Sequence, residues 1–147
     1  MSEKHNQQGS IIIEFALTFI LLIAVFSGAF EFGYTFFAYN TLVNAVREGS
    51  RYASLRPYDS ATATPSTAFR TAIQNMVVYG DPAGGTTPIV RGLAPSNVQL
   101  TVLTSGSAPL QVTVSINGFS IDAVFGTFIL NNKPACSFPY LGIPTPP

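Results

Sequence analysis

An uncharged apolar run near the N-terminus, from Phe15 to Phe30, constrains this chain more than any other feature. Its sixteen residues would form about 24 Å of helix at about 1.5 Å per residue, whereas a bilayer core of about 30 Å needs about 20 residues. A membrane span must therefore recruit Ile11–Ile13 on one flank or residues 31–37 on the other. We predict a single-pass span over about residues 11–37.

The helical pattern continues well beyond this span. Apolar or small residues recur at three- and four-residue steps, and no proline occurs before Pro57. The recurring residues are Leu42, Val43, Val46, Ser50 and Ala53. We therefore predict one long helix over residues 10–55, from Ser10 to Leu55, whose second part continues outside the membrane.

The small number of charged and titratable groups excludes several classes of protein. Charged residues make up 10% of the 147 residues and the formal net charge is zero, against a charged fraction of about 25% in an average domain. Because a nucleic-acid binder needs a basic surface, we expect no nucleic-acid partner. His5 is the only histidine, Cys136 is the only cysteine, and the seven acidic residues are spread singly. We expect no catalytic residue, no metal site and no cofactor.

Three interpretations of the apolar segment are open. It is an ordinary membrane anchor, or a secretory signal peptide cleaved near Ser27-Gly28-Ala29, or the start of a prepilin-type protein. In the third case residues 1–9 form a polar leader, a peptidase cuts between Gly9 and Ser10, and Glu14 becomes the fifth residue of the mature chain. The third interpretation explains the acidic residue Glu14, which the other two leave unexplained.

Glu14 needs an explanation because it lies inside an apolar stretch. Insertion scales give a cost of about 2.5–3.5 kcal/mol for Asp at a helix centre and less near the interface, and such a residue usually has a partner. Cleavage after Gly9 would create an amine on Ser10, one helical turn from Glu14. The Glu14 carboxylate of the same chain, or of a neighbouring subunit, could pair with that amine.

Further motifs follow along the same helix: Glu31-Phe32-Gly33 after the apolar run, and then Asn44–Ala53, which reads NAVREGSRYA. Together with the spacing of Gly9 and Glu14, they resemble the TadE family of minor pilins or pseudopilins, over roughly residues 9–55. The TadE family is one of the type IV pilin-like families. The resemblance therefore implies processing by a prepilin peptidase after Gly9 and a structural role in Flp/Tad-type pilus assembly and surface adherence. It also implies that Gly9 and Ser10 form the cleavage junction and that Glu14 serves recognition and assembly.

Several residues after the apolar run are candidate contacts with other subunits: Glu31, Gly33, Arg47, Glu48, Arg51 and Tyr52. Glu31 either ends the apolar run or meets a cation on a partner. Gly33 either lets a second helix approach closely or loosens its own helix. Arg47 and Arg51 lie one turn apart and repel each other, which indicates an acidic partner, with a solvated helix face as the alternative.

The positive-inside rule and the leader predict opposite orientations of the chain in the membrane. Lys4 and the amino terminus precede the span, whereas Arg47, Arg51 and Arg56 follow it, which taken alone favours a cytoplasmic C-terminal part. A junction after Gly9, however, is useful only to a peptidase that acts from the cytoplasmic face. We therefore expect the bacterial inner membrane, with the N-terminus in the cytoplasm and the head outside it, and the pilus or cell surface as a further location.

Residues 56–147 are predicted to form a small head, because the composition shifts there toward Pro, Gly, Ser and Thr. Ser66–Tyr79 has helical periodicity. Val98–Val102 and Val112–Ile116 alternate as two strands of an antiparallel hairpin. The predicted fold class is therefore α+β, with a long N-terminal helix followed by a pilin-like head of one helix and a short antiparallel sheet.

The end of the head is less regular. Phe119–Leu130 is an apolar run too short to span a bilayer, and it forms either a core helix or a surface patch. Within it Phe125, Phe128, Ile129 and Leu130 are candidates for an apolar contact surface, with ordinary core as the alternative. Residues 136–143 add a third strand.

The predicted function is that of a membrane-anchored, pilin-like structural subunit. Its expected partners are the prepilin peptidase, other pilin-like subunits, the pilus assembly machinery and membrane lipid, in an oligomeric or filament-associated state. Two alternatives remain open. One is a filament subunit proper, and the other is a single-pass, membrane-anchored binding module with an unprocessed N-terminus.

Overall fold

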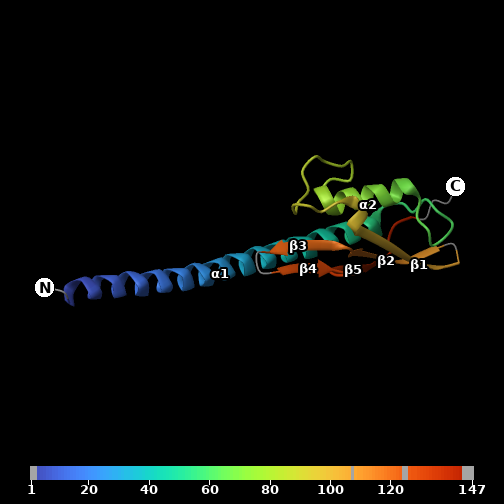
Figure 1. Ribbon diagram of the computed structural model, residues 1–147. Coiled ribbons are helices and arrows are strands. Elements are labelled where there is room, and N and C mark those ends of the chain that lie inside the picture. The colour runs from blue at the N-terminus through green and yellow to red at the C-terminus, as the bar shows by residue number, and fades with distance from the viewer. Residues whose placement is uncertain (1–2, 107, 124–125, 144–147) are drawn as a thin grey trace.

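The computed structural model describes residues 3–106, 108–123 and 126–143, and consists of one long helix with a head packed on its C-terminal half (Figure 1). Helix α1 (Glu3–Leu55) runs from the N-terminal end into the head. The predicted long helix is confirmed, but it begins at Glu3 rather than at Ser10. No proline precedes Ser10, and Glu, Lys and Gln are good helix formers, so nothing ends the helix at the leader boundary.

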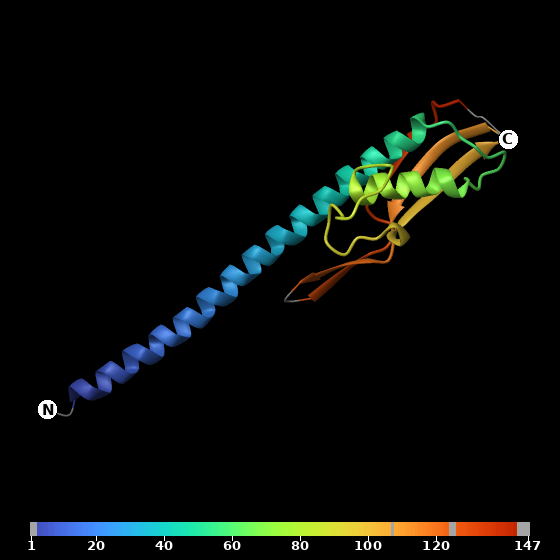
Figure 2. The same cartoon turned by 90° about the horizontal axis from the view of Figure 1, so that it is seen from above.

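The head is α+β, as predicted, and its main body has two layers. The C-terminal half of α1 and helix α2 (Thr67–Tyr79) lie on one face of a three-stranded antiparallel sheet (Figure 2). The short 3-10 helix η1 (Pro95–Asn97) leads from the loop after α2 into this sheet. The order of its strands is β1-β2-β5, formed by β1 (Val98–Ser105), β2 (Ala108–Ile116) and β5 (Ala135–Pro139).

The predicted second helix is confirmed, together with the signals that start and stop it. The Ser66 hydroxyl oxygen accepts a hydrogen bond from the Phe69 N–H at 3.1 Å, which caps the N-terminus of α2. Gly80 ends the helix in the left-handed conformation, at a φ of 75°, and its N–H donates to the Met76 carbonyl. The apolar face of α2 is buried, at Phe69, Ala72, Ile73, Val77 and Val78.

The predicted hairpin is confirmed, and the predicted third strand also forms, but it covers Ala135–Pro139 and does not extend over residues 140–143. Strands β1 and β2 pair antiparallel with Val98 opposite Ile116 and Val102 opposite Val112. These alternating side chains are buried and form the sheet's contribution to the core. Strand β5 pairs with β2 on the other side, with Cys136 opposite Val114.

The segment Phe119–Leu130 is not a core helix. It forms two antiparallel strands, β3 (Phe119–Ala123) and β4 (Gly126–Leu130), which we call the β3–β4 hairpin. Burial in β3 alternates with a period of two, which is the periodicity of a strand and not of a helix. Leu130 is half-buried, whereas Phe128 and Ile129 are 56% and 65% exposed and so form a surface patch. Phe125 lies outside the described residues.

The head is built around a stripe on α1 that the helix presents at three- and four-residue steps. Its buried residues are Ala38, Leu42, Val46, Gly49, Ser50, Ala53 and Ser54. They meet the apolar face of α2 and the inner face of the sheet in one core cluster. This burial holds the head in place along the second part of α1.

Hydrogen bonds close the head around the C-terminal end of α1. The Ser54 carbonyl accepts from the N–H groups of Leu141 and Gly142, both at 2.9 Å. The Tyr140 hydroxyl donates to the Arg56 carbonyl at 2.9 Å and accepts from the Tyr58 N–H at 2.8 Å. The segment after β5 therefore ties the end of α1 to the sheet.

The same contacts make two phenol groups sensitive to alkaline pH. Burial raises the pKa of Tyr58 and of Tyr140 above the usual 10.0. Because the folded state favours the neutral phenols, the stability they contribute is complete below pH 10 and is lost as the pH rises through the raised pKa values.

We expect Tyr140→Phe to lower the free energy of unfolding of the head by about 0.5–1.5 kcal/mol at pH 7, because its partly buried hydrogen bonds with the Arg56 carbonyl and the Tyr58 N–H are lost. It should also flatten the loss of stability above pH 10. Both effects are measured by urea titration of the detergent-solubilised protein, in which digestion by proteinase K reports the unfolded fraction. Tyr34→Phe is the control, since Tyr34 is 50% exposed. An equally steep alkaline loss in Tyr140→Phe would contradict this role.

Candidate functional site

Over residues 9–26, in its N-terminal half, α1 is bare on every side. The consecutive residues Ile11, Ile12 and Ile13 are 63%, 68% and 62% exposed, although they point in different directions around the helix. Within the part of the chain that the structure describes, α1 is the one helix long and apolar enough to cross a membrane, and none of its most apolar window is buried. This helix is compatible with a single-pass membrane anchor.

The predicted cleavage junction lies inside this bare helix. Gly9 and Ser10 belong to α1 and are exposed. Glu14 is also exposed, and because it lies four residues after Ser10, the two residues share one side of the helix. The structure therefore brings Ser10 and Glu14 together, at the spacing of one helical turn.

The motif Asn44–Ala53 divides between two faces of the helix. Its small residues Gly49, Ser50 and Ala53 are buried against the head. The Ser50 hydroxyl lies 2.8 Å from the Val46 carbonyl oxygen and 3.0 Å from the Cys136 carbonyl oxygen, so it can donate to either and links α1 to β5. The small residues of the motif thus serve the fold of this chain.

Gly49 lies where α2 packs tightly against α1. A Cβ atom at this position would collide with the Cγ2 atom of Val77, and it would lie 3.9 Å from the Ile73 carbonyl oxygen. Val77 is fully buried and β-branched, so its side chain has little room to move away. The absence of a side chain at Gly49 is therefore a packing requirement.

The charged residues of the motif lie on the opposite face. Arg47, Glu48 and Arg51 are all exposed. They point away from the head and form a charged face on the outside of α1. Of the predicted subunit contacts, these three are placed where another chain can reach them.

Tyr52 is placed differently. It is half-buried, its hydroxyl accepts a hydrogen bond from the Arg56 guanidinium at 2.9 Å, and its ring packs against the core. The Arg56 guanidinium carbon lies 5.8 Å from the centre of the Tyr52 ring and 6.0 Å from that of Phe69. Tyr52 and Arg56 are therefore engaged within their own chain.

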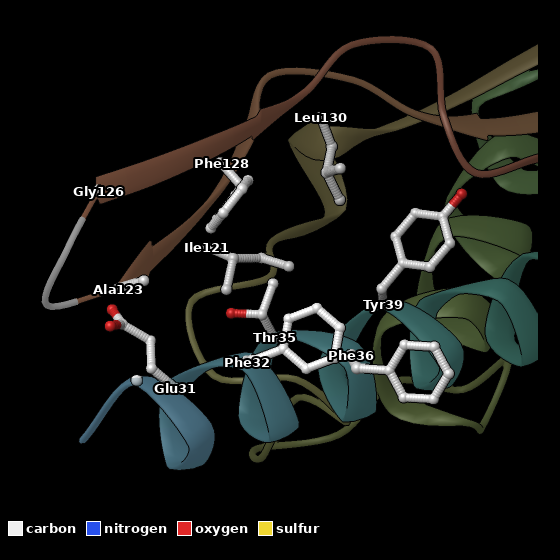
Figure 3. Close-up of a pocket in the computed structure, with 11 residues that line it drawn as sticks. Glu31, Phe32, Thr35, Phe36, Tyr39, Ile121, Ala123, Gly126, Phe128 and Leu130 are labelled. Carbon is white, nitrogen blue, oxygen red and sulfur yellow. The ribbon is translucent and has the colours of Figure 1, made fainter. Parts of the chain in front are cut away.

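Glu31 and Gly33 lie further toward the N-terminus, beside the β3–β4 hairpin. Glu31 is half-buried, and its carboxylate is directed toward Ala123 at the end of β3 (Figure 3). Gly33 is exposed, and no atom outside its immediate neighbourhood lies within 4 Å of where its Cβ would be. Glu31 thus faces its own head, whereas Gly33 leaves an open surface for a neighbouring helix.

The β3–β4 hairpin and α1 enclose an apolar groove that the sequence analysis missed. Its volume is about 400 Å³, and Figure 3 shows rings from α1 facing aliphatic and aromatic side chains of the hairpin. The helix contributes Phe32, Thr35, Phe36 and Tyr39, and the hairpin contributes Ile121, Phe128 and Leu130. The alternation of Phe119, Ile121 and Ala123 was the sequence signal for a strand here.

We expect Gly49→Ala to destabilise the packing of α2 on α1. The gain in helix propensity of about 1 kcal/mol is opposed by overpacking against Val77, which costs about 1–3 kcal/mol. Repeating the substitution in a Val77→Ala background should remove the penalty, and urea unfolding of the four proteins measures this coupling.

Gly33→Ala is the matched control, because it adds the same methyl group to an open position of the same helix. It should leave the head's stability unchanged. If Gly49→Ala costs the same with and without the Val77 side chain, the close approach is not what requires glycine.

The comparison with known families agrees with these motifs. Residues 9–51 match the family model described as TadE-like protein. No curated protein and no solved structure matches the chain. The matched region covers the bare half of α1 and the part of the motif that faces the head, up to Arg51. Over this N-terminal segment, the chain is similar to the TadE-like proteins.

Proposed function

We propose that this protein is a membrane-anchored, pilin-like structural subunit, a TadE-like pseudopilin that serves Flp/Tad-type pilus assembly and surface adherence. The observation that carries the proposal is the coincidence of the TadE-like segment with a helix that is apolar and uncovered on all sides. Such a helix suits both lipid and lateral packing with similar helices. The function is structural and involves no catalytic residue.

Processing is the first step of the proposed mechanism. A prepilin peptidase cuts between Gly9 and Ser10 and leaves a new amine at the start of the mature helix. The exposure of this junction supports access by the peptidase. The amine and the Glu14 carboxylate lie one turn apart, about 6 Å along the helix axis. They pair within one chain, or Glu14 pairs with the amine of a neighbour, which offsets the cost of a lone carboxylate in an apolar environment.

Lateral assembly is the second step. Other pilin-like subunits and the assembly machinery contact the uncovered surfaces of α1, including the open position at Gly33 and the charged face of Arg47, Glu48 and Arg51. Two exposed arginines one turn apart favour a partner with acidic groups. Glu31 and Tyr52 support the fold of their own chain in this proposal and are secondary contacts.

In the proposed topology, the protein spans the bacterial inner membrane and its head lies outside the cytoplasm. The leader then lies on the cytoplasmic side, where the peptidase reaches the junction. Arg47 and Arg51 follow the span, against the usual charge bias. A pairing with acidic groups of a partner compensates these charges.

The proposal predicts the mass of the protein extracted from its native membrane. The mature chain should begin at Ser10, and intact-mass spectrometry measures this directly. Glu3→Gln is an internal control, because a substitution in the leader must leave the mature mass unchanged. A chain that still begins at Met1 would favour the anchored binding module, and one that begins near Phe30 would favour a secretory signal peptide.

We further expect Glu14→Gln to leave membrane insertion intact and to reduce co-isolation of the protein with other pilin-like subunits by about tenfold or more, which corresponds to 1.4 kcal/mol. The amide keeps the size of the side chain and removes the charge that pairs with the Ser10 amine. Quantitative immunoprecipitation from crosslinked membranes measures the effect. Thr18→Val, one turn further along, is the control and should assemble normally. Normal assembly of Glu14→Gln would remove Glu14 from the mechanism.

A further inference from the structure

The β3–β4 hairpin stands apart from the three-stranded sheet and runs beside α1 toward its N-terminal end (Figures 1 and 2). Its position along α1 is fixed by the groove between them. Ala123 and Gly126, which flank the turn of the hairpin, line the groove together with Gly28 and Glu31, whereas Leu130 lies near Tyr39 (Figure 3). The Ala123 end of β3 and the Gly126 end of β4 therefore lie toward the N-terminal half of α1, and the base of the hairpin joins the head.

This placement sets the hairpin at a definite level of the membrane. Gly28 belongs to the uncharged run that ends at Phe30. Counting about 20 residues back from Phe30 reaches Ile11, so an α1 span over these residues puts Phe30 at the outer edge of the hydrocarbon. Ala123 at the end of β3 and Gly126 at the start of β4, which line the groove with Gly28 and Glu31, are then at that edge. Tyr39 lies about 14 Å further out, at about 1.5 Å per residue.

The surface of the hairpin has the chemistry of a lipid contact. Phe128 and Ile129 are exposed, and Asp122 is the one charged residue among the described residues of the two strands. The Asp122 carboxylate accepts a hydrogen bond from the Thr127 hydroxyl at 3.3 Å. Around the groove, Phe32 and Phe36 of α1 are also exposed. Apolar surface of this extent rarely faces water without a partner.

We propose that the β3–β4 hairpin is a second membrane contact, and that lipids of the outer leaflet enter the groove between it and α1 from the end near Gly28. This inference rests on the proposed single-pass anchor. Lipid is the occupant because the apolar wall of the groove continues directly into the uncharged surface of the span, which lipid already surrounds. Two contacts, the helix and the hairpin, fix the tilt and the rotation of the head above the bilayer, which a single helix alone leaves free.

Depth-dependent quenching tests this contact in the full chain. In a Cys136→Ser background, single cysteines replace Ile129 in the hairpin, Val25 in the span and Leu103 in β1, which are 65%, 64% and 58% exposed. Each protein is labelled with an environment-sensitive fluorophore and reconstituted in phosphatidylcholine vesicles. The lipids carry a spin label either near the headgroup or near the middle of the acyl chain.

The probe at position 129 should be quenched several-fold more strongly by the shallow spin label than by the deep one. The probe at position 25 should be quenched strongly by the deep label, and the probe at position 103 by neither. Because the three positions are exposed to a similar extent, differences in quenching report depth and not local crowding.

If the probe at position 129 behaves like that at position 103 while position 25 is quenched, the hairpin proposal is overturned and the anchor stands. If position 25 is not quenched either, the anchor itself is refuted and the hairpin contact with it. Energy transfer between labelled copies at position 129, with no quenching by lipid, would show that a second copy of the chain fills the groove, and would also overturn the proposal.

Discussion

Helix α1 lies in two different environments without interruption, and the boundary between them determines where the head packs. N-terminal to Ala38 no described side chain of α1 is fully buried, whereas from Ala38 onward a narrow stripe is buried at every turn. An apolar surface on all sides requires lipid or other helices. A single apolar stripe requires one globular partner, which the head supplies. The helix continues through this boundary without a break, so the position of the head follows the position of the span.

This arrangement explains why the TadE-like segment combines small residues with charged residues. Its small residues, Gly49 and Ser50, allow α2 and β5 to approach α1, and its charged residues, Arg47 and Arg51, face outward from the same turns. One short stretch of sequence thus serves folding on one side and, in the proposed assembly, contact with other chains on the other. The family match ends at Arg51, and most of the head lies beyond it. The rest of the head supplies the surface that packs on these small residues and on the apolar stripe around them.

Local patterns predicted much of this fold. The span, α2 and the β1–β2 hairpin each carry their own periodicity and their own stop signals, such as Ser66 and Gly80 for α2. The short run Phe119–Leu130 carries only a weak signal, the alternation of Phe119, Ile121 and Ala123, because an apolar run of that length fits a buried helix as well as a strand. The groove lay beyond sequence reasoning for another reason: Glu31 and Ala123 are far apart in the chain, and only tertiary packing brings them together. Likewise, only the packing of the head shows that Tyr52 turns inward while Arg51 turns outward.

The proposed assembly needs a driving force that lipid does not already provide. Acyl chains are as apolar as leucine, so moving the bare half of α1 from lipid to neighbouring helices gains little from hydrophobicity alone. The two environments differ in whether polar groups find a partner. Glu14 and a cleaved N-terminus on Ser10 find water only at the membrane surface, but in a bundle of helices they find each other, where a low dielectric strengthens their attraction. In the proposed mechanism, cleavage therefore does more than remove a leader: it supplies the positive charge without which the Glu14 carboxylate would oppose the packing of α1 among its neighbours.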